Sequence, residues 1–151
     1  GDFGVLIGEI IQIQDDLEDA FSKPANPDWL RQGNNILIIY ALNADYPDRG
    51  EFEALFPAIA AGNEESLVRA QDLLISSGAV SYAAYHLVQR YQRTWKLIDE
   101  LSLADPTPIT DILADFGKSL SEMLSISGVD IDLRTLRTDD LSAKFPASEQ
   151  S

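Results

Sequence analysis

One short acidic run has the residue types and the spacing to do chemistry. It covers residues 12–19 and reads Gln12-Ile13-Gln14-Asp15-Asp16-Leu17-Glu18-Asp19. On a helix, residues three, four and seven apart share a face, so Asp15, Asp16 and Asp19 should lie together, with Gln12 at the start of the same face. Carboxylates held this close repel one another and raise one another's pKa unless a cation neutralises them.

The ligand types in this run indicate which cation it would bind. Oxygen ligands without histidine or cysteine suit a hard cation, Mg²⁺ before Zn²⁺. Mg²⁺ uses few protein ligands and keeps positions for phosphate oxygens, so the pattern favours a site for Mg²⁺ and a diphosphate. A solvated acidic helix face is the alternative that spacing alone leaves open. The neighbouring apolar side chains favour the site; they are Ile10, Ile11, Ile13 and Leu17.

The composition of the whole chain excludes several classes of function. The 151 residues are 45% hydrophobic, enough for one folded domain, and 25 acidic residues face 11 basic ones, for a net charge of -14. Such a surface does not suit binding to nucleic-acid phosphates or to anionic membranes. The chain has no cysteine and one histidine, which excludes disulfides and multi-histidine metal sites. No apolar run approaches the ~20 residues of a membrane span, and we expect a cytoplasmic protein.

Hydrophobic periodicity predicts an all-α fold with five or six helices. The apolar run 36–42 would also fit a buried strand, but Asn34 or Asn35 can cap a helix there, and we favour the helix. Asn63 before two glutamates, and Thr107 before Pro108, are further N-terminal signals. The expected helical segments are 3–21, 36–42, 51–60, 63–76, 81–101 and 109–125, with a Pro-rich loop over 22–34.

Other residues that could carry chemistry have more ordinary interpretations. His86 and Trp95 are expected to be packing residues of the long helix, and Asp139-Asp140 to be solvated surface. Trp29 would either anchor the Pro-rich loop or cover a cavity, and the sequence does not separate these. An apolar stripe in the segment 109–125 is expected to be core or an interface; its members are Ile112, Leu113, Phe116, Leu120, Met123 and Leu124.

The acidic run and the segments after it resemble the trans-isoprenyl diphosphate synthases. Residues 8–19 are similar to the family's second aspartate-rich motif, roughly G-x-x-F-Q-I-x-D-D-x-x-D, with Ile11 in place of the usual Phe. Residues 22–28 resemble its G-K-P-x-G-x-D loop, and residues 36–42 its L-P-L-I-Y-A-L helix. The resemblance covers roughly residues 1–103 and is densest over 8–42.

This resemblance implies a fold, a reaction and a set of site residues. The chain would be the C-terminal part of an isoprenoid-synthase helical bundle, with residues 1–103 in that bundle, 104–127 an additional helix and 128–151 a polar tail. The reaction would be Mg²⁺-dependent condensation of an allylic diphosphate with isopentenyl diphosphate. Asp15, Asp16 and Asp19 would bind Mg²⁺, while Gln12 and Lys23 would reach the allylic diphosphate.

The sequence also departs from this family. The first aspartate-rich motif and the upstream basic residues are missing, so the chain would supply half a site. It would be inactive alone and need an N-terminal half, from the same gene product or a second chain, within a homo- or hetero-oligomer. No lysine stands in Gln32-Gly33-Asn34-Asn35, where the family has its second lysine; Arg31 is a possible substitute.

Two alternatives remain open at this stage. A non-catalytic regulatory or interaction member of the family would explain the missing lysine. A terpene cyclase or squalene/phytoene-type synthase would fit the D-x-x-E-D spacing that Asp15 begins. The loop around Lys23 favours the chain-elongating enzymes over this last class.

Overall fold

All regular structure in the described part of the chain is helical. The structure is a computed structural model that describes residues 1–31 and 33–126, and of residues 120, 123, 124 and 126 only the backbone. Within these ranges there is no strand, which confirms the all-α class. The elements are α1 (Asp2–Ala20), η1 (Pro27–Trp29), α2 (Ile36–Asn43), α3 (Arg49–Ala54), α4 (Phe56–Ala60), α5 (Glu64–Ser76), α6 (Ala79–Leu101) and α7 (Thr107–Ile126).

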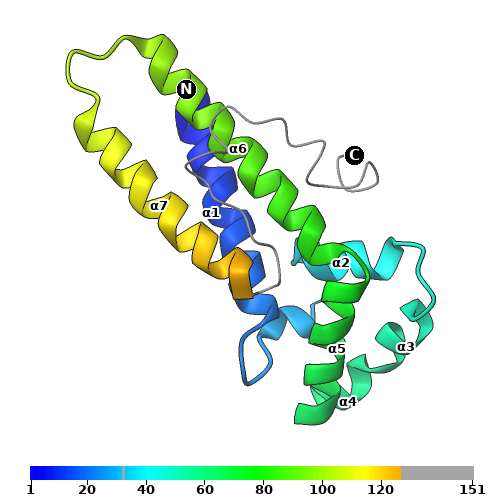
Figure 1. Ribbon diagram of the computed structural model, residues 1–151. Helices are drawn as coiled ribbons and strands as arrows, with labels where there is room; N and C mark the ends of the chain where they lie inside the picture. The colour runs from blue at the N-terminus through cyan, green and yellow to red at the C-terminus, as the bar shows by residue number, and fades with distance from the viewer. Residues whose placement is uncertain (32, 127–151) are drawn as a thin grey trace. The chain divides into compact units, whose positions relative to one another are not determined.

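The chain divides into two compact units, which are described separately (Figure 1). One unit is Ile13–Ala83; the other combines Gly1–Gln12 with the chain from Ala84 onward. Both divisions fall inside continuous helices, α1 and α6. The segment 128–151, with Asp139-Asp140, lies outside the described residues, so its predicted polar surface role stays a prediction.

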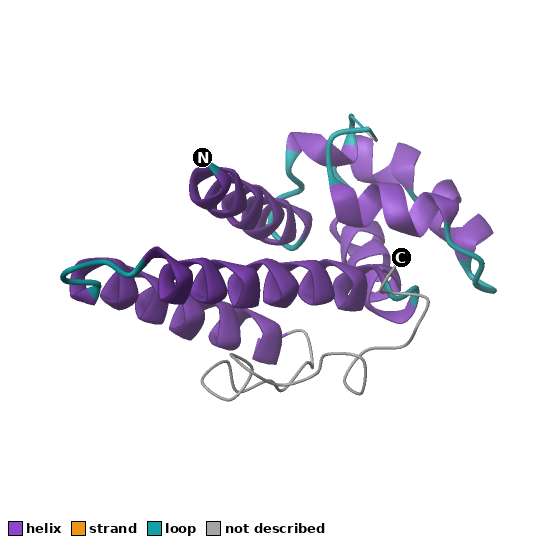
Figure 2. Ribbon diagram, turned by 90° about the horizontal axis from the view of Figure 1, so that it is seen from above, coloured by secondary structure: helices purple, strands orange, loops and turns teal. Residues whose placement is uncertain are grey.

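The unit that contains the end of α6 is built from long helices. Figures 1 and 2 show α6 and α7 side by side and antiparallel. The Arg90 guanidinium links α6 to the first part of α1, with its Nε 2.7 Å from Glu9 Oε2. The core of this unit is apolar and aromatic, as expected for Trp95; its buried members include Leu87, Val88, Tyr91, Trp95, Ile98 and Leu113.

The unit Ile13–Ala83 packs short helices around an aromatic cluster. In it α2 packs against α3 and α5, and α4 packs against α5 and η1. Trp29 is 1% exposed, and its ring centre lies 5.9 Å from that of Phe52 and 5.7 Å from that of Phe56. Trp29 therefore anchors the Pro-rich loop in the core, which settles the choice that the sequence left open.

Several helix ends shift by one or two residues from the expected ranges, and two differences have a clear physical reason. The predicted helix over 51–60 is two helices, because Pro57 lacks an N–H and its ring blocks the backbone of the preceding turn. Pro57 instead occupies the first turn of α4, where a missing N–H costs nothing. Thr107 is the first residue of α7 and not its cap, because its N–H donates to Asp105 Oδ1 at 3.1 Å.

No helix in the described ranges is long and apolar enough to cross a membrane. This agrees with the expectation from the sequence, which contains no long uncharged apolar run. The longest helix, α6, carries five charged residues in its second half: Arg90, Arg93, Lys96, Asp99 and Glu100.

A pair of glycine substitutions tests the packing of α6 on α7. A Cβ on Gly117 would overlap the hydroxyl of Tyr91 and lie 3.0 Å from its Cζ, so Gly117→Ala should lower the free energy of unfolding by about 1–3 kcal/mol. Gly8 also lies inside a helix, but a Cβ there meets nothing within 4 Å, so Gly8→Ala should raise stability by about 0.5–1 kcal/mol. Urea unfolding measures both, and a stabilising Gly117→Ala would contradict this packing.

Candidate functional site

The acidic face predicted from the sequence forms on the last two turns of α1. Asp15 is exposed, and Asp16 and Asp19 are half-buried. The opposite face of these turns supplies the buried side chains Ile13, Leu17 and Ala20, which hold the helix against its unit. The apolar stripe thus fixes which way the carboxylates project.

Asp16 is engaged in a contact between helices. The backbone N–H of Ile36 donates to Asp16 Oδ2 at 3.1 Å. Ile36 is the first residue of α2, whose N-terminal N–H groups have no partner within the helix. Asp16 therefore joins α1 to the start of α2, and one of its two carboxylate oxygens is already in use.

Asn35 reinforces this junction from inside the core. It is fully buried, and its Oδ1 accepts from the Leu37 N–H at 3.0 Å, as expected for the N-cap of α2. Its Nδ2 donates to the carbonyl oxygen of Asp16 at 2.8 Å and to Asp28 Oδ2 at 3.2 Å. One side-chain amide thereby connects α1, the turn around η1 and α2.

The end of α1 is held by a second buried amide. Gln71 of α5 is 5% exposed, and its Nε2 donates to the carbonyl oxygens of Ala20 at 3.1 Å and Ser22 at 3.2 Å. These carbonyls follow the last turn of α1, where no intrahelical donor remains. Gln71 and Asn35 therefore fix the acidic segment at both ends.

Asp28 is a member of the acidic cluster that the sequence analysis did not identify. It lies in η1, where its N–H donates to Asn26 Oδ1 at 2.9 Å, and its carboxylate acts electrostatically on both Asp16 and Asp19. The Asn-Pro-Asp signal marked a turn, but nothing in the sequence showed that the turn folds back against α1.

The cluster carries unrelieved negative charge. Burial is the main cause that raises the pKa of Asp16, and the carboxylates of Asp28, Asp19 and Asp15 raise it further, while the bond from Ile36 lowers it. Burial also raises the pKa of Asp19, followed by the charges of Asp28 and Asp15. A bound cation would relieve this repulsion, which is the electrostatic condition for a metal site.

The donor set fits Mg²⁺ in a limited sense. All four candidate ligands are carboxylates, which a hard cation prefers. Among the described residues, no group of three or more acidic, histidine or cysteine side chains is arranged to hold a metal ion. One or two carboxylates per ion, completed by water and phosphate oxygens, is the arrangement typical of Mg²⁺ sites that bind phosphates.

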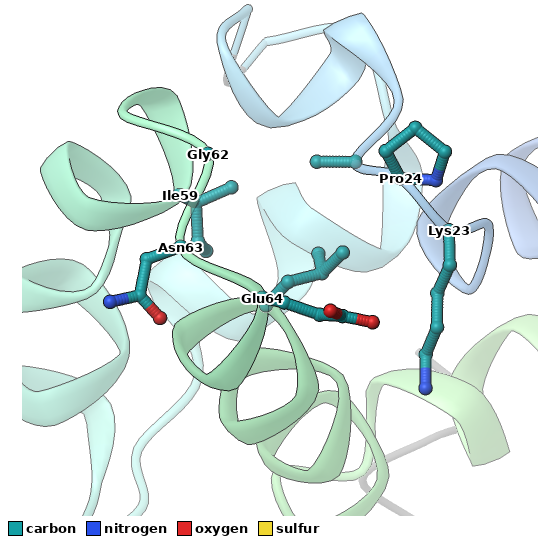
Figure 3. Close-up of a pocket in the computed structure, with 8 residues that line it drawn as sticks. Lys23, Pro24, Ile59, Gly62, Asn63 and Glu64 are labelled. Carbon is teal, nitrogen blue, oxygen red and sulfur yellow. The ribbon is translucent and has the colours of Figure 1, made fainter.

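The predicted substrate-binding residues Gln12 and Lys23 are both exposed. Gln12 is exposed on α1, one turn before Asp15 and Asp16 in helix register. Lys23 is exposed and lines a pocket of about 370 Å³ (Figure 3), and none of the clustered aspartates lines that pocket. Arg31 is exposed and makes no ion pair among the described residues.

His86 has the structural surroundings expected of it. Its Nδ1 lies 3.0 Å from Arg90 Nη1, and its ring packs edge-on against Tyr85. The predicted apolar stripe of α7 is partly described. Leu113 is buried and Ile112 exposed, while the side chains of residues 120, 123 and 124 lie outside the described set.

Comparisons with known proteins assign no family. No protein-family model, curated protein or solved structure matches the chain.

Replacing Asn35 tests the junction between α1 and α2. Asn35→Ala removes a cap and two further buried bonds, and should lower the free energy of unfolding by about 2–4 kcal/mol. Asn63→Ala is the matched control, because Asn63 caps α5 through one exposed bond to the Ser66 N–H, and its loss should cost about 1 kcal/mol. Equal losses in the two variants, measured by chemical denaturation, would contradict a tertiary role for Asn35.

The raised pKa of Asp19 has a defined consequence for stability. A carboxylate whose pKa is higher in the folded than in the unfolded protein binds protons more tightly when folded, so it lowers stability as the pH rises through that interval. In metal-free buffer, Asp19→Asn should therefore be more stable than the parent at pH 7, by a few tenths of a kcal/mol after solvent screening. The difference should shrink as the pH falls through the ordinary aspartate pKa of about 3.9 and vanish by about pH 2.5, where Asp19 is protonated in both the folded and the unfolded chain. A constant difference across a pH series of unfolding curves would disprove this origin.

Proposed function

We propose that this chain supplies one Mg²⁺-binding wall of a prenyltransferase site. The observation that carries the proposal is the gathering of Asp15, Asp16 and Asp19 with Asp28, in which burial and mutual repulsion raise the pKa of Asp16 and Asp19. The order of residues around this cluster resembles the second aspartate-rich region of the trans-isoprenyl diphosphate synthases. The reaction would join an allylic diphosphate to isopentenyl diphosphate.

In such a site, some of the described residues would bind the metal and others would position the metal ligands. Asp15 and Asp19, one helical turn apart, have carboxylates free of bonds to the backbone of α2 and would bind the metal. Asp16 would contribute at most its second oxygen, because Oδ2 accepts from Ile36. Bound Mg²⁺ would supply charge stabilisation for the departing diphosphate. Asn35 and Gln71 hold the helix that carries these ligands.

The substrate contacts and the partner rest on the resemblance alone. Gln12 and Lys23 are assigned to the allylic diphosphate in this way. The other metal-binding wall would come from an N-terminal half, either of the same gene product or of a second chain in a homo- or hetero-oligomer. The chain alone is therefore expected to be inactive.

Two observations favour a second candidate, a non-catalytic regulatory or interaction member of the same family. Asp16 is used to join α1 to α2, and Gly33 lies in the segment where the family carries a lysine. Both features would weaken the binding of a diphosphate while leaving the helical fold intact. Loss of metal binding in the assembled protein would favour this candidate.

Binding of Mg²⁺ with inorganic diphosphate tests the proposed site directly. In calorimetric titrations, diphosphate should bind only when Mg²⁺ is present, because the carboxylates repel the bare anion. Asp15→Asn and Asp19→Asn should each weaken binding about tenfold or more. Asp72→Asn removes an exposed carboxylate of α5 outside the cluster and should leave the affinity unchanged.

The assembled protein then separates the two candidates. With the N-terminal half supplied, release of diphosphate from an allylic substrate and isopentenyl diphosphate would support the enzyme, and Asp15→Asn should abolish it. Absence of turnover together with no detectable Mg²⁺ binding would support the non-catalytic member. Diphosphate binding that does not depend on Mg²⁺ or on Asp15 would refute the proposed metal site.

A further inference from the structure

The pocket beside Lys23 has the size of a small-molecule site. It has a volume of about 370 Å³ and lies entirely within the unit Ile13–Ala83. It is bounded by the turn after α1, the end of α4 and the first turn of α5, as Figure 3 shows. Known small-molecule pockets occupy roughly 300–1,000 Å³, so this one suits a compact ligand.

Apolar residues form part of the pocket's lining, beside the polar residues Lys23, Asn63 and Glu64. Ile59 and Leu67 are each 3% exposed and form its floor, and Pro24 and Ala25 add an apolar wall. Such a surface gains free energy by excluding water, so it favours a ligand with an aliphatic group. A wholly polar ligand would leave this surface uncovered.

Two opposite charges border the same opening. Lys23 and Glu64 are exposed and line the pocket; in Figure 3 the Glu64 side chain is directed toward the Lys23 side of the opening, while the Lys23 side chain extends along that side. They form no ion pair with each other, and neither makes one with another described residue. The rim therefore offers one ammonium group and one carboxylate, at separate places, to a ligand.

The charges around the helix start exclude a simple anion as the ligand. The N-terminus of α5 carries Glu64 and Glu65 in its first turn, which already offset the positive end of the helix dipole. Asn63 Oδ1 accepts from the Ser66 N–H at 3.0 Å, so this donor is also satisfied. A phosphate in this pocket would face the Glu64 carboxylate and gain only Lys23.

We propose that this pocket binds a small zwitterion with an aliphatic group, the chemistry of a free apolar α-amino acid. The ligand carboxylate meets the Lys23 ammonium, the ligand ammonium meets the Glu64 carboxylate, and the side chain lies on Ile59 and Leu67. None of the clustered aspartates lines this pocket, and the proposal gives Lys23 a ligand other than the allylic diphosphate that the resemblance assigns to it.

Methyl-resolved NMR titration with L-leucine tests this site. The affinity of so small a ligand is on the order of 1 mM, which NMR measures readily. Saturable shifts should appear at the methyl groups of Ile59 and Leu67. Absence of such shifts up to about 20 mM leucine would overturn the proposal.

Substitutions at the rim and charge-deleted analogues separate the two contacts. Lys23→Met and Glu64→Gln should each weaken leucine binding about fivefold. Isopentylamine, which lacks the carboxylate, should not be weakened by Lys23→Met, and isocaproate, which lacks the ammonium, should not be weakened by Glu64→Gln. Glu65→Gln changes the neighbouring exposed acid, which does not line the pocket, and should leave leucine binding intact.

The control variant also defines the outcome that refutes the proposal. If Glu65→Gln weakens leucine binding as much as Glu64→Gln, the effect comes from net charge, and the proposed contact between Glu64 and the ligand ammonium is wrong. If leucine binds the Lys23→Met and Glu64→Gln variants as well as the parent, recognition is apolar only and the zwitterion is excluded. The substituted side chains are exposed, so amide spectra of the variants should report an unchanged fold.

Discussion

The buried amide of Asn35 is the interaction on which the architecture of the unit Ile13–Ala83 depends. Its three hydrogen bonds connect α1, the turn around η1 and the first turn of α2. A buried polar side chain is costly unless its bonding capacity is met, so these bonds permit one arrangement of the three segments and penalise others. The position of Asp28 against the acidic face follows from this arrangement, because its carboxylate accepts one of the three bonds.

The acidic cluster results from this packing and also destabilises it. Burial raises the pKa of Asp16 and Asp19, and the neighbouring carboxylates, Asp28 among them, raise it further, so the ionised cluster destabilises the folded chain near neutral pH. Proteins keep such repulsion where a cation or a protonated state relieves it. The bond from Ile36 offsets part of the cost at Asp16, which shows how one carboxylate can support the helix junction while its neighbours remain available to a ligand.

The pocket beside Lys23 arises from a different constraint, the way in which the short helices end. Pro57 divides the segment 49–60 into α3 and α4, and Gly62, with φ of +88°, turns the chain sharply into α5. Trp29 fixes the preceding loop against Phe52 and Phe56. Loop, turn and helix start are therefore held rigidly around an apolar floor.

Local pattern in the sequence determined the all-α class, the cap Asn63, a cap at Asn34 or Asn35, and the shared face of Asp15, Asp16 and Asp19, because each depends on residues within one or two helical turns. The same local pattern did not predict the break at Pro57 and wrongly predicted Thr107 as a helix cap, although both signals were local. Tertiary structure alone decided that Trp29 is an anchor, that Asp28 joins the acidic face and that Asp16 bonds to α2. It also decided that Lys23 lines a pocket without the aspartates. These facts depend on contacts between different segments of the chain. Hydrophobic periodicity does not encode such contacts, because they are fixed by the packing of several helices at once.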